Sequence, residues 1–127
     1  MKMKHLIAAG TAAMILLTAP VGASAAQVSD FTDISPGAWY YNAVEYATDE
    51  GLFAGTSADT FSPDLAMTRG MFVTVLGRQA GVSSEKPTDA SFTDVAPSAY
   101  YAPYVEWAAE NGIVNGTSST TFAPEQK

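Results

Sequence analysis

Cysteine is absent from the chain, and its one histidine, His5, stands among the first residues. The absence of cysteine excludes a disulfide framework, thiolate metal sites and a thiol nucleophile. The absence of any later histidine removes the side chain that most often serves as general base or zinc ligand near neutral pH. Neither a glycine-rich phosphate loop nor a calcium loop of alternating acids occurs. We therefore expect no catalysis, no metal and no cofactor.

Basic residues are also scarce, with 6 lysines and arginines against 13 aspartates and glutamates. Two of the six, Lys2 and Lys4, lie in a segment that we expect to be removed, which leaves four basic residues and a net charge of −9. The four are Arg69, Arg78, Lys86 and Lys127. Such a chain repels nucleic acid and anionic membranes, so an anionic ligand needs a specific local site.

Residues 1–26 have the pattern of a secretory signal peptide. A basic start precedes an apolar run over residues 6–19, and the small residues Ala23-Ser24-Ala25 follow. A membrane-spanning helix needs about 20 apolar residues, and this run is shorter. The segment predicts secretion, with cleavage after Ala25 or Ala26, and an uncleaved anchor helix is the alternative.

A repeat with a shift of 61 positions organises the rest of the chain. Phe31-Thr32-Asp33-Ile34 returns as Phe92-Thr93-Asp94-Val95, and the same shift without gaps aligns residues 31–66 with 92–127. Sixteen of the 36 aligned pairs are identical, including glycines, prolines and aromatic residues that fix turns and core positions. We therefore interpret these segments as two copies of one structural unit.

Each copy begins with the signals of a helix. Ser35-Pro36 predicts the start of a helix that runs to Glu50 and stops at Gly51, and the second copy repeats this pattern from Pro97 to Gly112. In the first copy a second helix is predicted over 69–80, capped by Thr68 and ended by Gly81. Its buried stripe is expected to consist of Met71, Phe72, Val75, Leu76 and Ala80.

These signals divide the chain into a signal peptide (1–26), a first repeat (27–81), a polar linker (82–90) and a second repeat (91–127). The second repeat is truncated before its second helix. The predicted fold class is mainly α, made of helix-loop-helix repeats. One such unit buries little apolar surface, so the repeats are expected to pack on neighbours.

The ordered motifs of the repeat resemble those of the S-layer homology domain. The motifs are Phe31-Thr32-Asp33-Ile34, Trp39-Tyr40, Gly51-Leu52-Phe53-Ala54-Gly55, Thr60-Phe61-Ser62-Pro63 and Thr68-Arg69-Gly70. The resemblance implies repeats that normally pack in threes as a pseudo-threefold bundle and bind secondary cell-wall polysaccharide, often through a pyruvate ketal. The implied role is non-covalent anchoring of a secreted protein to the bacterial cell wall or S-layer, without nucleic acid or membrane as a partner.

The resemblance also suggests which residues bind the ligand. In the family a Thr-Arg-Ala-Glu segment opens the second helix and its arginine meets the acidic ligand; here that segment begins with Thr68 and Arg69. Gly70 stands for the alanine and Met71 for the glutamate, which removes a capping box but opens the backbone to a ligand. An arginine beside free N–H groups at a helix start would hold a carboxylate.

Three further residues complete the predicted site. Trp39 and its counterpart Tyr100 are expected to offer aromatic faces to sugar rings, and Asp33 is the remaining candidate. The alternatives are that Arg69 pairs with Asp64 or another nearby acid, that Trp39 lies in the core, and that Asp33 caps a turn or a helix start. For Arg78 the simplest interpretation is a favourable charge near a helix end.

Two other functions stay open at this point. The repeats fit a protein–protein interaction module that binds other surface proteins and does not bind glycan. They also fit the targeting part of a larger exoenzyme or S-layer protein.

Overall fold

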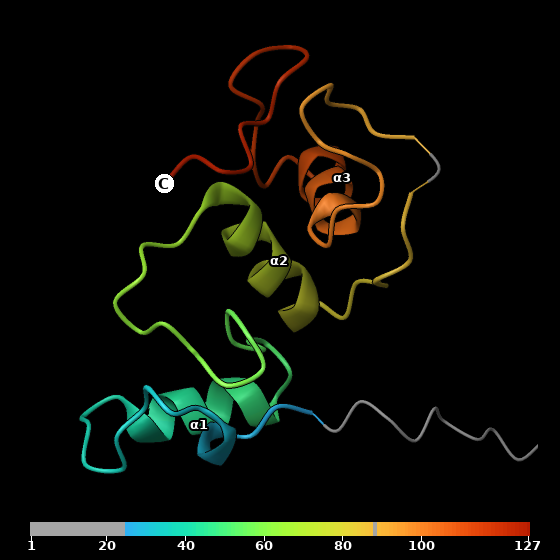
Figure 1. Cartoon of the computed structure of the whole chain (residues 1–127). Coiled ribbons are helices and arrows are strands. Elements are labelled where there is room, and N and C mark those ends of the chain that lie inside the picture. Colours follow the sequence, from blue (N-terminus) through green and yellow to red (C-terminus); the bar gives the residue numbers. More distant parts are fainter. Residues whose placement is uncertain (1–24, 88) are drawn as a thin grey trace, which may run out of the picture.

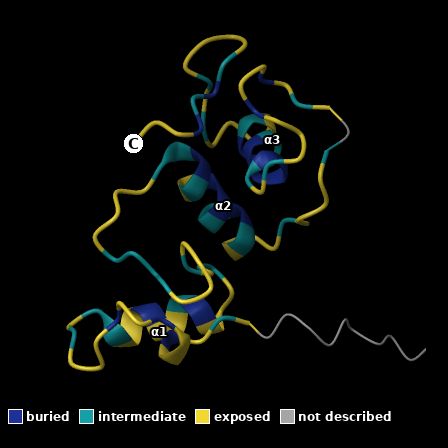
Figure 2. Cartoon of the chain, viewed as in Figure 1, coloured by how far each residue is buried: buried dark blue, intermediate teal, exposed yellow. Residues whose placement is uncertain are grey.

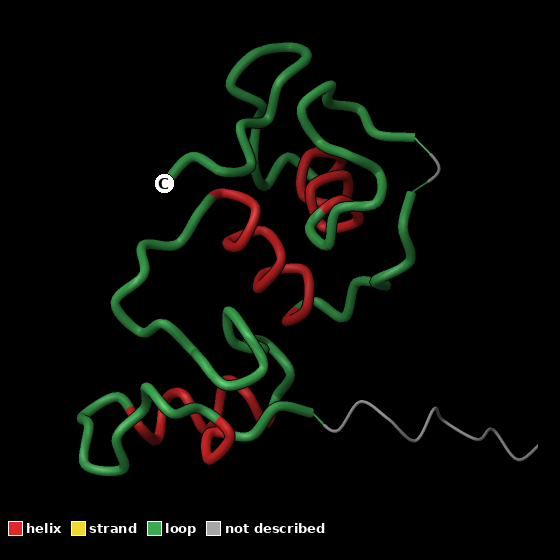
Figure 3. Tube along the Cα trace, viewed as in Figure 1, coloured by secondary structure: helices red, strands yellow, loops and turns green. Residues whose placement is uncertain are grey.

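The computed structural model describes residues 25–87 and 89–127, so the predicted signal peptide lies almost wholly outside the described residues. The ordered elements are a 3-10 helix, η1 (Val28–Asp30), and the α-helices α1 (Tyr41–Asp49), α2 (Arg69–Gln79) and α3 (Ala102–Glu110). Long loops join these helices, and no strand occurs over the described ranges (Figures 1 and 3). The prediction of a mainly α fold is confirmed. No helix in this part of the chain has the length and apolarity that a membrane crossing requires.

The two copies of the repeat share the same hydrogen bonds. The N–H of Thr32 donates to the carbonyl oxygen of Asp59 at 2.9 Å, and one repeat later the N–H of Thr93 donates to that of Thr120 at 2.8 Å. The hydroxyl groups of both threonines donate to the same two carbonyl oxygens. The sequence repeat is therefore also a structural repeat.

A carboxylate clamps a strained turn in each copy. The carboxylate oxygens of Asp33 accept the N–H groups of Phe61 and Ser62 at 2.8 and 2.7 Å. Asp94 accepts two N–H groups at the same distances, and these belong to Phe122 and Ala123. Ser62 and Ala123 precede prolines with φ of 59° and 58°, a left-handed conformation that costs about 1–3 kcal/mol in a residue other than glycine. The two carboxylates offset this strain.

The predicted helix ends are confirmed. Gly51, Gly81 and Gly112 have φ of 68°, 73° and 65°, which is the conformation that closes a helix. Thr68 caps α2, because its hydroxyl accepts the N–H of Met71 at 3.2 Å.

The predicted start of the first helix is wrong in both copies, whereas α2 begins at Arg69 as predicted. α1 begins at Tyr41 and α3 at Ala102, and turns precede them where Ser35-Pro36 and Pro97 predicted helix. In place of the predicted first helical turns, the N–H groups of Ala38 and Tyr41 donate to the carbonyl oxygens three residues back, at Ser35 and Ala38. These turns precede α1, and Ile34 before them packs in one buried cluster with Val44 of α1.

The described residues form two apolar cores, and α2 belongs to the second. The first core holds Val28, Phe31, Ile34 and Val44. The second is built from residues of the second repeat and from Val73 of α2: Val73, Phe92, Val95, Ala102, Tyr104, Val105, Ala108 and Phe122. α2 thus follows the first repeat in sequence but packs on α3, while α1 lies apart from both (Figures 1 and 2).

The predicted buried stripe of α2 is also wrong. The buried residues are Gly70, Val73, Thr74 and Gly77, whereas Phe72 is 48% exposed. Small residues form this face because aromatic rings of the second repeat lie against it. A Cβ atom at Gly77 would collide with the ring of Tyr104.

Gly77→Ala is expected to lower the free energy of unfolding by about 1–3 kcal/mol, because the added methyl group overpacks the contact with Tyr104. Gly37→Ala is the matched control, since a Cβ atom at Gly37 meets nothing within 4 Å. Chemical denaturation of both variants measures the difference. Equal stabilities would contradict the close α2–α3 contact.

Asp94→Asn is expected to lower the melting temperature more than Asp33→Asn, because Asp94 holds the fully buried Phe122 in place. The two N–H groups of the turn bind different oxygens of the carboxylate, and asparagine would present an NH2 group to one of them, so one hydrogen bond is lost. Thermal melts followed by circular dichroism measure both variants.

The same clamps predict a loss of stability in acid. Hydrogen bonds from the N–H groups of Phe61 and Phe122 hold the pKa values of Asp33 and Asp94 below their ordinary value of 3.8. The stabilisation is therefore complete above about pH 4 and is lost as pH falls through the lower folded-state pKa values. In the double Asn variant this part of the acid dependence should disappear.

Candidate functional site

Arg69 joins the start of α2 to the loop of the second repeat. Its Nε–H donates to the carbonyl oxygen of Phe122 at 3.0 Å, and Nη2 donates to that of Asn115 at 2.7 Å. The guanidinium carbon also lies 4.6 Å from the centroid of the Phe122 ring, within the range of a cation–π contact. Arg69 therefore binds carbonyl oxygens, and the alternative of an ion pair with Asp64 is not what the structure contains.

The N–H groups at the start of α2 are occupied as well. Those of Arg69 and Gly70 donate to the carbonyl oxygens of Gln126 and Pro124, each at 2.8 Å. The Thr68 hydroxyl takes the N–H of the third helical residue. The expectation of free N–H groups at this helix start is therefore wrong, because the second repeat uses them for packing.

Gly70 also has a packing role. A Cβ atom at this position would lie 3.0 Å from the ring of Tyr101 and 3.2 Å from the carbonyl oxygen of Pro124. Both distances are shorter than ordinary van der Waals contact. The small residue lets α2 approach the second repeat, whereas the sequence suggested access for a ligand.

The other predicted site residues lie in different surroundings. Trp39 is 93% exposed, with its ring against the edge of Tyr40, so the alternative of a core position is excluded. Asp33 clamps the turn at Phe61, as the capping alternative proposed. Ligand binding by Arg69, Thr68, Gly70, Trp39 and Asp33 remains a prediction.

Arg69→Gln is expected to lower the free energy of unfolding by about 2–3 kcal/mol, because the charged hydrogen bonds to Phe122 and Asn115 are lost. Lys127→Gln removes the same charge from an exposed side chain and serves as the control. Urea denaturation distinguishes the two. If Arg69→Gln unfolds at the same urea concentration as the wild type, the contacts of Arg69 with the second repeat do not stabilise the fold.

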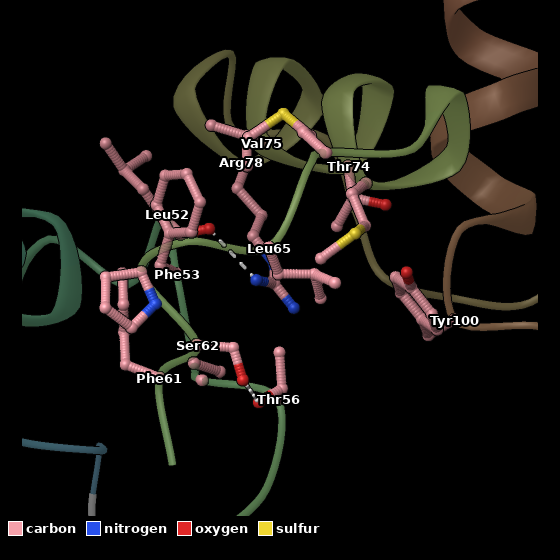
Figure 4. Close-up of a pocket in the computed structure, with 15 residues that line it drawn as sticks. Leu52, Phe53, Thr56, Phe61, Ser62, Leu65, Thr74, Val75, Arg78 and Tyr100 are labelled. Atoms are coloured by element: carbon pink, nitrogen blue, oxygen red, sulfur yellow. Dashed lines mark hydrogen bonds between the residues drawn. The ribbon is translucent and has the colours of Figure 1, made fainter. Parts of the chain in front are cut away.

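A cavity of about 550 Å³ lies between the loop of the first repeat, α2 and Tyr100 (Figure 4). Apolar side chains form most of its wall: Leu52, Phe53, Phe61, Leu65, Met67, Met71 and Val75. Hydroxyl groups of Thr56 and Ser62, hydrogen-bonded to each other at 2.6 Å, form another part. This mixture of apolar surface and a few polar groups is typical of a small-molecule site.

Arg78 supplies the charge of the cavity. Figure 4 shows its side chain reaching from α2 toward the loop, where one guanidinium nitrogen donates to the carbonyl oxygen of Leu52 at 3.0 Å. Among the described residues, which include all 13 aspartates and glutamates, none of these acids lines the cavity. The cavity is thus a local cationic site within an acidic protein.

Tyr100 stands at the side of this cavity, as Figure 4 shows. Burial raises the pKa of its hydroxyl group, nearby Glu125 raises it further, and Arg78 lowers it. The hydroxyl is therefore neutral at physiological pH and can donate a hydrogen bond. Of the six residues predicted from the sequence, Tyr100 is the one that lines the cavity.

Sequence reasoning missed Arg78 because a basic residue in the last turn of a helix needs no other explanation. A signal was nevertheless present. Met71, Val75 and Arg78 follow each other at spacings of four and three, which places them on one helical face. The sequence predicted that Met71 and Val75 lie in the core, whereas in the structure they line the cavity together with Arg78.

A family model for the S-layer homology domain matches residues 30–70 and 91–127. These two segments cover more than half of the chain and correspond to its two repeats. The chain therefore belongs to the S-layer homology domain family.

Several larger proteins contain a similar segment. The Surface-layer 125 kDa protein of Lysinibacillus sphaericus is 32% identical over 124 residues, which cover 98% of this chain and 10% of that protein. The Endoglucanase of Bacillus sp. (strain KSM-635) is 32% identical over 96 residues, covering 76% of this chain and 10% of the enzyme. The Cellulosome-anchoring protein of Acetivibrio thermocellus is 27% identical over 99 residues, covering 75% of this chain and 22% of that protein.

The chain therefore spans about a tenth to a fifth of the length of these relatives. They differ in kind, since two are surface or anchoring proteins and one is an enzyme, yet they share this small segment. The common segment supports a module for anchoring at the cell surface. The catalytic activity named for the endoglucanase belongs to a part of that enzyme outside the matched segment.

Proposed function

We propose that this chain is exported and anchors itself to the bacterial cell wall by binding an acidic wall polysaccharide in the cavity beside Arg78. One observation carries the proposal. The cavity holds a guanidinium group and no carboxylate, in a chain with a large excess of acidic residues. Such a site selects an anionic ligand against the repulsion of the whole protein.

The guanidinium of Arg78 suits a carboxylate. It is planar and always charged, and its N–H groups form paired hydrogen bonds with two carboxylate oxygens. The helical position of Arg78 and its hydrogen bond to the carbonyl oxygen of Leu52 hold the side chain in place before a ligand arrives. This order lowers the entropy cost of binding.

The rest of the cavity suits a sugar ring. Phe53 and Phe61 lie 5.8 Å apart between ring centroids and give an aromatic wall against which C–H groups can pack. Tyr100, Thr56 and Ser62 place hydroxyl groups nearby for hydrogen bonds with sugar hydroxyls. An acidic group with an apolar substituent, such as a pyruvate ketal on a sugar, matches both kinds of surface.

The anchoring role agrees with the names of relatives that contain a similar segment. Two of the relatives are named as a surface-layer protein and a cellulosome-anchoring protein, and a wall-binding segment suits both roles. In this proposal Arg69 and Thr68 have an indirect part, because they hold α2 and hence Arg78 in position.

Arg78→Gln is expected to weaken binding to purified, protein-free wall polysaccharide by about tenfold or more, because the paired charged hydrogen bonds are lost. Arg78→Lys should recover part of the affinity, since it keeps the charge without the planar geometry. Co-sedimentation or calorimetry measures the binding constants, and circular dichroism checks the fold.

Lys127→Gln provides the matched control, because it removes one positive charge from an exposed side chain outside the cavity. Its affinity should stay within about twofold of the wild type. Wild-type affinity in Arg78→Gln, or an equal loss in both variants, would refute the assignment. Binding only to wall preparations that retain protein would favour a protein–protein module.

A further inference from the structure

Two asparagine–glycine pairs occur in the sequence, and both lie in the second repeat. They are Asn111-Gly112 at the end of α3 and Asn115-Gly116 in the loop that follows. The first repeat has Glu50 and Ala54 in the places of the two asparagines. An asparagine before glycine is prone to lose its side-chain amide, because glycine has no side chain to hinder attack by its own backbone nitrogen.

Hydrogen bonds at the end of α3 hold the first pair. The side-chain amide of Asn111 donates to the carbonyl oxygen of Trp107 at 2.8 Å. The N–H of Gly112 donates to the carbonyl oxygen of Ala109 at 3.1 Å. Both bonds must break before the Gly112 nitrogen can attack the Asn111 side chain, so the fold protects this pair.

The second pair is not held in this way. Asn115 is exposed to solvent. Within residues 25–87 and 89–127, neither its side-chain amide nor the N–H of Gly116 makes a hydrogen bond. The Gly116 nitrogen can therefore attack the Asn115 side chain without breaking a hydrogen bond first.

Arg69 activates the peptide group between Asn115 and Gly116. Its Nη2 donates to the carbonyl oxygen of Asn115 at 2.7 Å, and that carbonyl carbon is bonded to the nitrogen of Gly116. When this nitrogen loses its proton, negative charge spreads onto the carbonyl oxygen. The guanidinium group stabilises that charge and so makes the nitrogen a better nucleophile.

We propose that Asn115 is a site of spontaneous deamidation, assisted by Arg69, whereas Asn111 is protected. Hydroxide takes the proton from the Gly116 nitrogen, which then attacks Cγ of Asn115 and closes a succinimide ring. The bond from Cγ to the amide nitrogen breaks, and this nitrogen takes up a proton and leaves as ammonia. Water opens the ring at either carbonyl carbon, which gives an aspartyl or an isoaspartyl residue.

Both products change the residue that Arg69 binds. In the aspartyl product the new carboxylate is the former side-chain amide, and the backbone is unchanged. In the isoaspartyl product the backbone runs through the side chain and is longer by one carbon atom. The carbonyl group that accepted the Arg69 hydrogen bond then becomes a free carboxylate. Each product adds one negative charge to the loop that binds the start of α2.

Incubation of the purified chain at mildly alkaline pH tests the proposal, with tandem mass spectrometry to assign each conversion to its residue. Asn115 should react about tenfold or more faster than Asn111, because the hydrogen bonds that must break are found only at Asn111. In the chain unfolded in guanidinium chloride the two rates should be similar. Equal rates in the folded chain, or a faster reaction at Asn111, would overturn the proposal.

Two variants separate activation by Arg69 from a general loosening of the loop. Arg69→Gln removes the guanidinium group and should slow the reaction at Asn115 severalfold. Thr68→Ala removes the cap of the same helix start but keeps the guanidinium group, so it should not slow the reaction. A reaction at Asn115 that is as fast or faster in Arg69→Gln would refute the role of Arg69. All of these rates are measured without polysaccharide, so they are independent of the binding result for Arg78.

Discussion

The structure depends on the contact between Arg69 and the loop of the second repeat. One side chain satisfies two carbonyl oxygens and covers the ring of Phe122, while the adjoining N–H groups bind the same loop. Asp94 fixes the other side of that loop by holding the N–H of Phe122. A helix that follows the first repeat in sequence is thereby built into the core of the second. The second core therefore contains residues from both copies of the repeat.

The packing of α2 on the second repeat explains how the cavity is formed. The small-residue face of α2 lies on α3, and the adjacent face, with Met71, Val75 and Arg78, is turned toward the loop of the first repeat. Three short helices could not bury all of their apolar surface within one repeat. The remaining apolar surface lines a cavity, and Arg78 is the group that we propose selects an anion there.

The sequence predicted those features that depend on single residues or on the repeat. The glycine helix ends and the Thr68 cap follow from local backbone chemistry, and the turn bonds recur because the residues recur. The starts of α1 and α3 and the buried face of α2 depend on contacts between distant segments. Gly70 and Gly77 contribute no apolar area, so a search for large apolar residues misses them, although they set the closest helix contact. Tyr100 was predicted because it is the counterpart of Trp39 in the repeat. Arg78 was not predicted as a site residue, because the cavity that it lines exists only in the folded chain.

The most direct test of the central claim changes the ligand and leaves the protein intact. Wall polysaccharide is purified free of protein, and in half of it the carboxylate groups are converted to neutral amides. Calorimetric titration of the chain should give binding to the acidic form and a loss of about tenfold or more in affinity for the neutral form. Equal affinity for the two forms would contradict recognition of an acidic sugar by a guanidinium group.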